Sequence, residues 1–357
     1  MATTKNTTKR APKKKTAPKK HHTLKKWLFI TLGVFVLFVL AAYIAFRTSP
    51  WPGALIIRYV FEQGGKKTSQ ALEKYVPSGV SSIQNEQYRP NDKDALLDVY
   101  YPNTVKNTHE TLPTIVWIHG GAWISGSKKD VANYLKIIAA HGYTAVGVDY
   151  SIAPAKHYPT PLLQLNDALL YIQEHAERLH INPYNIVLAG DSAGSQIAAQ
   201  MAALITNPPY ASLLNIDPTL QPSQLRATIL NCGAYDLALP DYNGEAGAFL
   251  KTVLWAYSGK KDFLNDPVLR QASVIDYVTA DFPPTFITAG NADPLESQSR
   301  EFAKKLQSLN VSTDTLFYPK DHTPKLSHEY QFVLDNADGK QALARILRFL
   351  NTQTTSQ

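Results

Sequence analysis

A serine between glycines is the first residue whose surroundings suggest chemistry. Ser192 lies in the pentapeptide GDSAG, which follows the apolar run NIVLA and precedes an Ala-rich helical pattern. Because the glycines allow a sharp turn between a strand and a helix, the serine hydroxyl would be exposed above a sheet. The alternative is a glycine-rich helix start with the serine as its N-cap. The place between strand and helix favours a nucleophile.

A second glycine-rich turn, HGGAW at residues 119–123, directly follows the apolar run TIVWI. Successive backbone N–H groups in such a turn can point together at an oxyanion, joined by the N–H of Ala193, the residue after the serine. Because these donors belong to the backbone, Ala122 can stand where a glycine would otherwise be. The simpler alternative is a loop that needs its glycines only in order to turn.

A catalytic triad also needs an acid and a base, and the sequence offers two candidates for each. Asp293 and Asp236 each follow an apolar, β-rich run. We favour Asp293, which lies between a strand and a helix, and interpret Asp236 as a pocket or structural residue. His322 and His328 both follow the last predicted strand, and either preserves the chain order Ser, Asp, His. The residues alone leave the base open between these two histidines.

Alternating strands and helices must position these residues. The predicted strands are Leu97–Tyr101, Thr114–Ile118, Thr144–Asp149, Asn185–Ala189, Ala227–Asn231, Thr285–Thr288 and Thr313–Tyr318. The predicted helices are Val131–His141, Leu162–Leu179, Ser195–Ile205, Glu296–Leu309 and Lys340–Leu350. This alternation predicts a mostly parallel sheet covered by helices on both faces, with its chemistry at the carboxyl ends of the strands.

The N-terminal part has a different composition. Residues 1–26 contain ten Lys or Arg and no acid, whereas the remainder has 26 basic and 29 acidic residues. Residues 27–46 follow without a charge, and a helix of this length crosses roughly 30 Å of hydrocarbon. We expect an uncleaved signal anchor rather than a core helix, and the run is longer than that of a cleaved signal peptide. The positive charges before it place the tail in the cytoplasm and the following domain outside.

Four parts are therefore expected. They are a disordered, basic cytoplasmic tail (1–26), a transmembrane signal anchor (27–46), a stalk and lid segment (47–90) with helices at Ala54–Phe61 and Ser69–Tyr75, and a catalytic domain (91–357). We expect the tail to set topology and contact anionic lipid rather than bind nucleic acid. His21 and His22 are interpreted as solvated tail residues, not as metal ligands. Cys232 is the only cysteine, so no intrachain disulfide can form.

Several motifs in order resemble the hormone-sensitive-lipase-like branch of the α/β-hydrolase esterases, over about residues 90–350. They are HGGAW, GDSAG, DYSIAP at 149–154, the continuation YPTPLLQLNDALLYI, and NADPL around Asp293. Two positions depart from the family pattern: Ser151 stands where the family has arginine, and Ala122 replaces the third glycine. The resemblance implies the α/β-hydrolase fold, a mostly parallel central sheet with helices on both faces and a small lid.

The resemblance also implies roles for single residues. They are Ser192 as nucleophile, Asp293 as acid, and Gly121, Ala122 and Ala193 as oxyanion donors, with Gly120 adjoining. The family's base lies in an HGF-like motif soon after a Tyr-Pro pair. HEYQF at 328–332 fits the H-x-aromatic pattern, and the last helix begins about ten residues later. This favours His328 as the base and makes His322 a loop residue.

These residues predict a serine carboxylesterase or lipase that forms an acyl-enzyme on a small or acylated lipid or glycan ester outside the membrane. No metal or organic cofactor is expected. The alternative is a non-catalytic ligand-binding or adhesion protein on the same fold, which would be expected to lose a triad member. A peptidase is disfavoured because nothing suggests the extra domain that would admit peptides. The aromatic residues of 235–260 either line an acyl pocket or pack the lid: Tyr235, Phe249, Trp255 and Tyr257.

Overall fold

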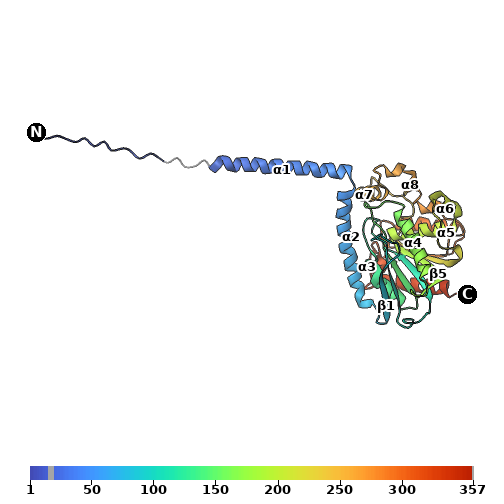
Figure 1. The fold of residues 1–357 in the computed structure, drawn as a ribbon. Coiled ribbons are helices and arrows are strands. Elements are labelled where there is room, and N and C mark those ends of the chain that lie inside the picture. The colour runs from blue at the N-terminus through green and yellow to red at the C-terminus, as the bar shows by residue number, and fades with distance from the viewer. Residues whose placement is uncertain (15–19, 356–357) are drawn as a thin grey trace. The chain divides into compact units, whose positions relative to one another are not determined.

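The protein contains two compact units, Met1–Ser49 and Pro50–Gln357. A computed structural model describes residues 1–14 and 20–355, without the side chains of residues 20–24 (Figure 1). The second unit begins at Pro50, so most of the segment predicted as a separate stalk and lid belongs to the same compact unit as the sheet that follows.

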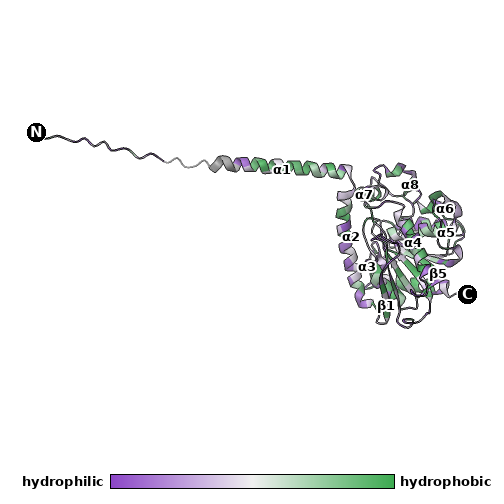
Figure 2. Ribbon diagram, viewed as in Figure 1, coloured by the Kyte–Doolittle hydropathy of each residue, from purple (hydrophilic) through white to green (hydrophobic). Residues whose placement is uncertain are grey.

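The first unit contains one long helix. Residues 1–14 form neither helix nor strand, and α1 spans Lys20–Thr48. Within the described residues, Lys25–Thr48 is the only segment long and apolar enough to cross a membrane, as the green colour of α1 shows (Figure 2). A signal sequence would share these properties. Helix α1 begins at Lys20, before the boundary predicted at residue 27 between the tail and the anchor. Residues 15–19 lie outside the described residues.

The second unit starts with α2, Trp51–Leu72, followed by a 3₁₀ turn at Glu73–Tyr75. Two helices were predicted here, separated near the pair Gly64 and Gly65, and the structure has one continuous helix instead. A Cβ on Gly65 would lie 2.9 Å from Oδ1 of Asp130 on the neighbouring helix α3, Lys128–Ala139. The glycine therefore lets α2 approach α3 closely, and this packing outweighs its low helix propensity.

Eight strands form one sheet in the order β1-β2-β4-β3-β5-β6-β7-β8. Their bounds are β1 Val80–Gln87, β2 Leu96–Pro102, β3 Leu112–Ile118, β4 Thr144–Val148, β5 Ile181–Asp191, β6 Leu225–Asn231, β7 Thr285–Ala289 and β8 Thr313–Phe317. Strand β2 pairs antiparallel with β1 and β4, and the other neighbours are parallel. The sequence missed β1, because this edge strand, VSSIQNEQ, has no buried residue and no strong apolar pattern.

Helices cover both faces of the sheet. Their bounds are α3 Lys128–Ala139, α4 Thr160–Glu174, α5 Ala193–Thr206, α6 Pro208–Leu214, α7 Gly247–Ser258, α8 Pro267–Arg270, α9 Glu296–Ser308 and α10 Ala337–Thr354. One core cluster joins α4, α5 and α9 to the sheet, and a second joins α3 and α10 to it. Alternate strand residues enter the two clusters, for example Val116 and Trp117 of β3. The prediction of an α/β-hydrolase fold with a mostly parallel sheet is confirmed; α6, α7 and α8 were not predicted.

Polar contacts fasten α2 to the second unit. Arg58 donates from Nε to the carbonyl oxygen of Ile124 and from Nη2 to that of Ala153, each at 2.7 Å. Farther along α2, Asn133 Nδ2 of α3 donates to the carbonyl oxygen of Ser69 at 2.8 Å. These bonds join α2 to the loop after β3, to the loop after β4 and to α3.

The Arg58 contacts predict a loss of stability when the guanidinium is removed. Arg58→Met takes the donors from two carbonyl groups of buried residues, and we expect the free energy of unfolding to fall by about 1–3 kcal/mol. Thermal unfolding of the full chain in detergent micelles, followed by circular dichroism, measures this. Lys66→Met, at an exposed position on the same helix, is the matched control. An equal effect of the two substitutions would contradict the assignment.

Candidate active site

Ser192 occupies the sharp turn between β5 and α5, with φ 51° and ψ −120°. Such a positive φ strains a residue other than glycine, so the surrounding packing must hold it there. A Cβ on Gly190 would overlap the backbone of Gly194, and one on Gly194 would overlap the carbonyl oxygen of Ile118. The pattern GxSxG is therefore a steric requirement of this turn, which presents the serine hydroxyl at the carboxyl end of β5.

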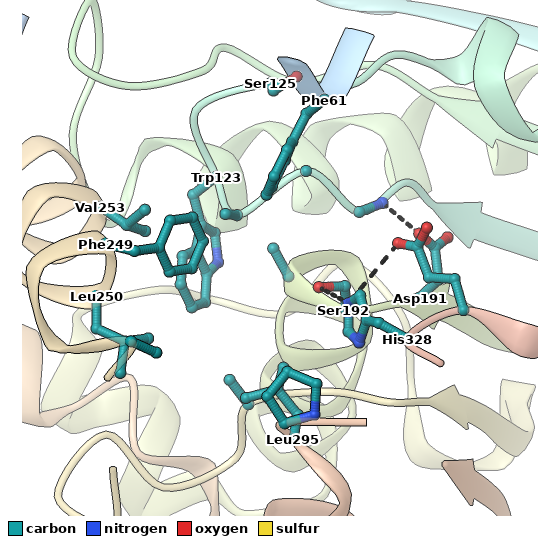
Figure 3. Close-up of a pocket in the computed structure, with 18 of the residues that line it drawn as sticks. Phe61, Trp123, Ser125, Asp191, Ser192, Phe249, Leu250, Val253, Leu295 and His328 are labelled. Carbon is teal, nitrogen blue, oxygen red and sulfur yellow. Dashed lines mark hydrogen bonds and ion pairs between the residues drawn. The ribbon is translucent and has the colours of Figure 1, made fainter. Parts of the chain in front are cut away.

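Three side chains from three strand ends form one chain of hydrogen bonds. His328 Nε2 lies 2.9 Å from Ser192 Oγ (Figure 3). On the other side of the ring, His328 Nδ1 lies 2.9 Å from each carboxylate oxygen of Asp293. Asp293, buried in the turn after β7, also accepts from the backbone N–H of Leu295 at 2.7 Å. With the proton on Nδ1 donated to Asp293, Nε2 is free to accept the serine proton.

The two alternative residues lie in other contacts. His322 Nε2 is 3.1 Å from Asp338 Oδ2, and its ring packs against Tyr318 at 4.6 Å between centroids. Asp236 Oδ1 accepts from the backbone N–H of Ala238 in its own turn, at 2.8 Å. The structure thus brings His328 and Asp293 to Ser192, and neither His322 nor Asp236.

Backbone N–H groups beside Ser192 are available to a ligand. Gly121 and Ala122 have φ of 112° and 52°, and both line the cavity above the serine together with Ala193. Within the described residues, none of these three amides donates to a protein acceptor. Ala193 is the first residue of α5, where a helix leaves its N–H groups unpaired. Gly120 differs from the prediction, because its N–H donates to Asp191 Oδ2 at 2.8 Å and is not free.

A buried carboxyl group ties this loop to its neighbours. Asp191 accepts from Trp117 Nε1 at 2.7 Å and from the amide of Gly120, and its side chain is hydrogen-bonded to Glu329. Burial, and after it the charge of Glu329, raises the pKa of Asp191 well above its usual range. Asp191 therefore favours its neutral, protonated form. Sequence reasoning missed both residues, although an acid inside the GDSAG turn and another beside His328 were visible signals.

A further polar group, the Cys232 thiol, lies beside the histidine. Ligand atoms of Cys232, Asp293 and His328 lie within 4.8 Å of one another. Burial raises the pKa of the Cys232 thiol to about 11, so it stays protonated at neutral pH. Because a metal would need the thiolate, and Asp293 and His328 are bonded to each other, this set favours hydrogen bonding over metal binding.

Burial alone would lower the pKa of His328, but its neighbours reverse this and hold it well above the usual range. Those neighbours are Cys232, Asp293 and Glu329. Among them, Asp293 makes the direct contact, with each carboxylate oxygen 2.9 Å from Nδ1. Its hydrogen bond to Nδ1 stabilises the imidazolium form.

A cavity of about 910 Å³ opens over Ser192 and has mainly apolar walls. Figure 3 shows side chains from α2 (Phe61), from α7 (Phe249, Leu250, Val253) and from two loops (Trp123, Leu295) around it. Of the four aromatic residues considered from the sequence, only Phe249 lines this cavity. Tyr235 stacks on Phe302, Tyr257 stacks on Trp123, and Trp255 lies against Lys261. Helix α2, part of the segment predicted as stalk and lid, supplies another wall of the cavity.

Comparison with known proteins places this arrangement in a family. The family model described as BD-FAE matches residues 97–306, a range that includes Ser192 and Asp293 and ends before His328. A putative alpha/beta hydrolase of Acanthamoeba polyphaga mimivirus is 25% identical over 66% of this chain and 66% of its own length. Esterase LipQ of Mycobacterium tuberculosis is 27% identical over 63% of this chain and 53% of its own length. Carboxylesterase NlhH of the same species is 29% identical over 66% of this chain and 71% of its own length. The chain thus covers under two thirds of the first two relatives.

Solved structures share the fold. Esterase B of Lactobacillus Rhamnosis superposes with a TM-score of 0.72 at 21% identity, covering 85% of this chain and 96% of that one. An esterase of Pyrobaculum calidifontis gives a TM-score of 0.67 at 21% identity, covering 85% and 94%. At this identity the likeness extends to the architecture of the sheet and its helices.

Proposed function

Because the chain belongs to the BD-FAE family and to the hormone-sensitive-lipase-like esterases of α/β-hydrolase fold, we propose that it is a serine carboxylesterase. The observation that carries the proposal is the hydrogen-bonded chain from Ser192 through His328 to Asp293 at the floor of an apolar cavity. The names of several relatives, esterase and carboxylesterase, support it.

The proposed reaction proceeds through an acyl-enzyme. Ser192 Oγ attacks the ester carbonyl while His328 Nε2 takes its proton, and Asp293 stabilises the imidazolium that forms. The oxyanion accepts hydrogen bonds from the free amides of Gly121, Ala122 and Ala193. His328 then gives its proton to the departing alcohol, and a water molecule activated by His328 releases the acid. Protein groups supply every proton transfer, so the scheme uses no cofactor.

The alternative function is a ligand-binding or adhesion protein that keeps the fold without the reaction. Such a protein needs no strained serine and no base within 3 Å of it. Here Ser192 has a positive φ, and the histidine ring nitrogens are both engaged at 2.9 Å. Because strain of this kind costs stability and persists where it serves a function, these features favour the enzyme.

We also propose that residues 27–46 act as an uncleaved anchor in the cell membrane, after a cytoplasmic tail of residues 1–26. The length and apolar composition of Lys25–Thr48 support a single span. The ten basic residues before the span and the slightly acidic remainder support an outside location for the catalytic domain, residues 91–357, with its lid segment 47–90.

Hydrolysis of p-nitrophenyl butyrate by the full chain in detergent micelles tests the proposed function. We expect turnover that Ser192→Ala abolishes, and covalent labelling of the wild-type serine by a fluorophosphonate probe, because only the activated hydroxyl is nucleophilic enough to react. Ser195→Ala removes a hydroxyl that donates to the Gly190 carbonyl oxygen and is the control that keeps labelling. A wild-type chain with neither turnover nor labelling would refute the proposal.

Exchange of each histidine tests the choice of base. We expect His328→Ala to lower kcat by about 10³-fold or more, because the serine loses its proton acceptor. His322→Ala removes a ring that contacts Asp338 and Tyr318, and most activity should remain. Steady-state kinetics of both variants with p-nitrophenyl butyrate measure this, and the reverse ranking would transfer the role to His322.

The raised pKa of His328 predicts where activity is lost in acid. The reaction needs the neutral imidazole, so kcat/KM falls as the pH decreases through the pKa of the free enzyme. Because that pKa is raised, we expect the half-maximal point above about pH 6.5, the ordinary value for histidine. A pH profile of kcat/KM locates it. Glu329→Gln removes a raising neighbour and should move the point downward, whereas Glu301→Gln on the surface should not. A wild-type point below 6.5 would contradict this assignment.

A further inference from the structure

The first three turns of α2 expose an apolar face to solvent. Among the described residues of the second unit, fourteen large hydrophobic side chains are exposed, and six of them lie within Trp51–Phe61: Trp51, Leu55, Ile56, Tyr59, Val60 and Phe61. Four of them, Leu55, Ile56, Tyr59 and Val60, form one side of the helix, whereas Trp51 and Phe61 fall toward the other side, where Phe61 packs on Phe249. The opposite side carries the buried Ala54 and the anchoring Arg58. Since isolated exposed hydrophobic residues are ordinary, it is this concentration that needs an explanation.

The position of this face in the sequence points to what covers it. Only Ser49 and Pro50 separate α2 from α1, the segment with the properties of a membrane span. Because successive Cα atoms are 3.8 Å apart, the Cα atom of Trp51 lies within about 11 Å of the Cα atom of Thr48, the last residue of α1. Where α1 ends in a bilayer, the first turns of α2 must therefore lie at its surface.

The composition of α2 changes along its length in the way a membrane surface requires. After Phe61 the exposed side chains are polar or charged: Glu62, Gln63, Lys66, Lys67 and Gln70. Figure 2 shows this change from green to purple along α2. The apolar half includes Trp51 and Tyr59, the residue types enriched where the hydrocarbon meets the headgroups.

The same face borders the mouth of the active-site cavity. Val60 and Phe61 are exposed and also line the cavity. Leu239, in the loop before α7, is likewise exposed and lines the cavity. Phe61 packs on Phe249 of α7, with ring centroids 5.9 Å apart. The apolar surface of α2 is thus continuous with the apolar wall that leads toward Ser192 (Figure 3).

We propose that residues 51–61 of α2 lie in the lipid headgroup–acyl boundary, and that the cavity receives the acyl chain of an ester lipid directly from that leaflet. The proposal rests on the proposed esterase function and names its substrate class. A cavity of about 910 Å³ lies near the upper end of the range for small-molecule sites, which suits a long acyl chain. The chain enters past Val60 and Leu239 without crossing water, and the ester carbonyl stops at Ser192.

Comparison of a lipid ester and a soluble ester in one preparation tests this. The full chain is reconstituted in phosphatidylcholine vesicles that contain dioleoylglycerol, and oleate release is measured beside hydrolysis of p-nitrophenyl butyrate. We expect the wild type to hydrolyse both. Leu55→Glu combined with Ile56→Glu should lower oleate release about tenfold or more, because charge is unfavourable in the boundary, and leave the soluble ester within about twofold. Leu213→Glu, on the exposed side of α6, is the matched control and should change neither rate.

The outcomes separate this inference from the function on which it rests. Loss of soluble-ester turnover in the wild type would refute the esterase. Soluble-ester turnover without oleate release, or a double variant that releases oleate as fast as the wild type, would overturn the membrane inference alone.

A label decides the location of the face without any activity. Ile56→Cys and Leu213→Cys are each coupled to a fluorophore in vesicles that contain nitroxide-labelled lipid. The buried Cys232 thiol, with its raised pKa, should stay unreacted. Quenching at residue 56 and not at 213 is expected. Equal, weak quenching at both positions would overturn the inference and would fit a face covered by a second copy or a protein partner. This measurement needs no activity, so it still decides the question if the double variant misfolds and loses both activities.

Discussion

The geometry of the site depends on one buried carboxyl group. Asp191 accepts from the indole of Trp117 in β3 and from the amide of Gly120, and its side chain is hydrogen-bonded to Glu329. These contacts join the strand that ends at the serine turn, the strand that ends at the oxyanion loop, and the loop that carries the histidine. A buried carboxylate without partners would be very unfavourable, so the polar groups around it must keep their places. By occupying the amide of Gly120, it also leaves the next amides, those of Gly121 and Ala122, facing the cavity.

The parallel sheet supplies the common edge that this network fastens. Strands β3, β5 and β7 end at the same edge of the sheet, with β6 between the last two, and the loops that follow them hold the oxyanion donors, Ser192 and Asp293. The glycines at 190 and 194 allow the strand and helix backbones to approach closely enough to force a positive φ on the serine. The strain is therefore maintained by the packing of β3 against α5, far from any flexible surface.

The parts of the molecule that sequence predicts well are those in which one local pattern determines the structure. The apolar runs gave seven strands, and the GDSAG turn required glycine for steric reasons that hold in any such turn. His328 was distinguishable from His322 only through the family resemblance, because both histidines follow β8 and nothing local separates them. The edge strand β1, the continuous α2 and the pair Asp191–Glu329 were missed. Each of these depends on contacts between distant segments: β1 on β2, Gly65 on Asp130, and Glu329 on Asp191.

Helix α2 links the two halves of the proposed function. It is fastened to the catalytic unit through Arg58, it supplies Phe61 to the cavity wall, and it begins two residues after α1. A flexible linker would let the active site sample the surrounding water and dilute any membrane-bound substrate. In the proposed arrangement, a short connection to a helix that is itself part of the pocket would instead keep the mouth of the cavity near the end of the span. The proposed anchor would then do more than locate the enzyme, because it would bring the acyl-binding wall to the surface from which an ester lipid enters.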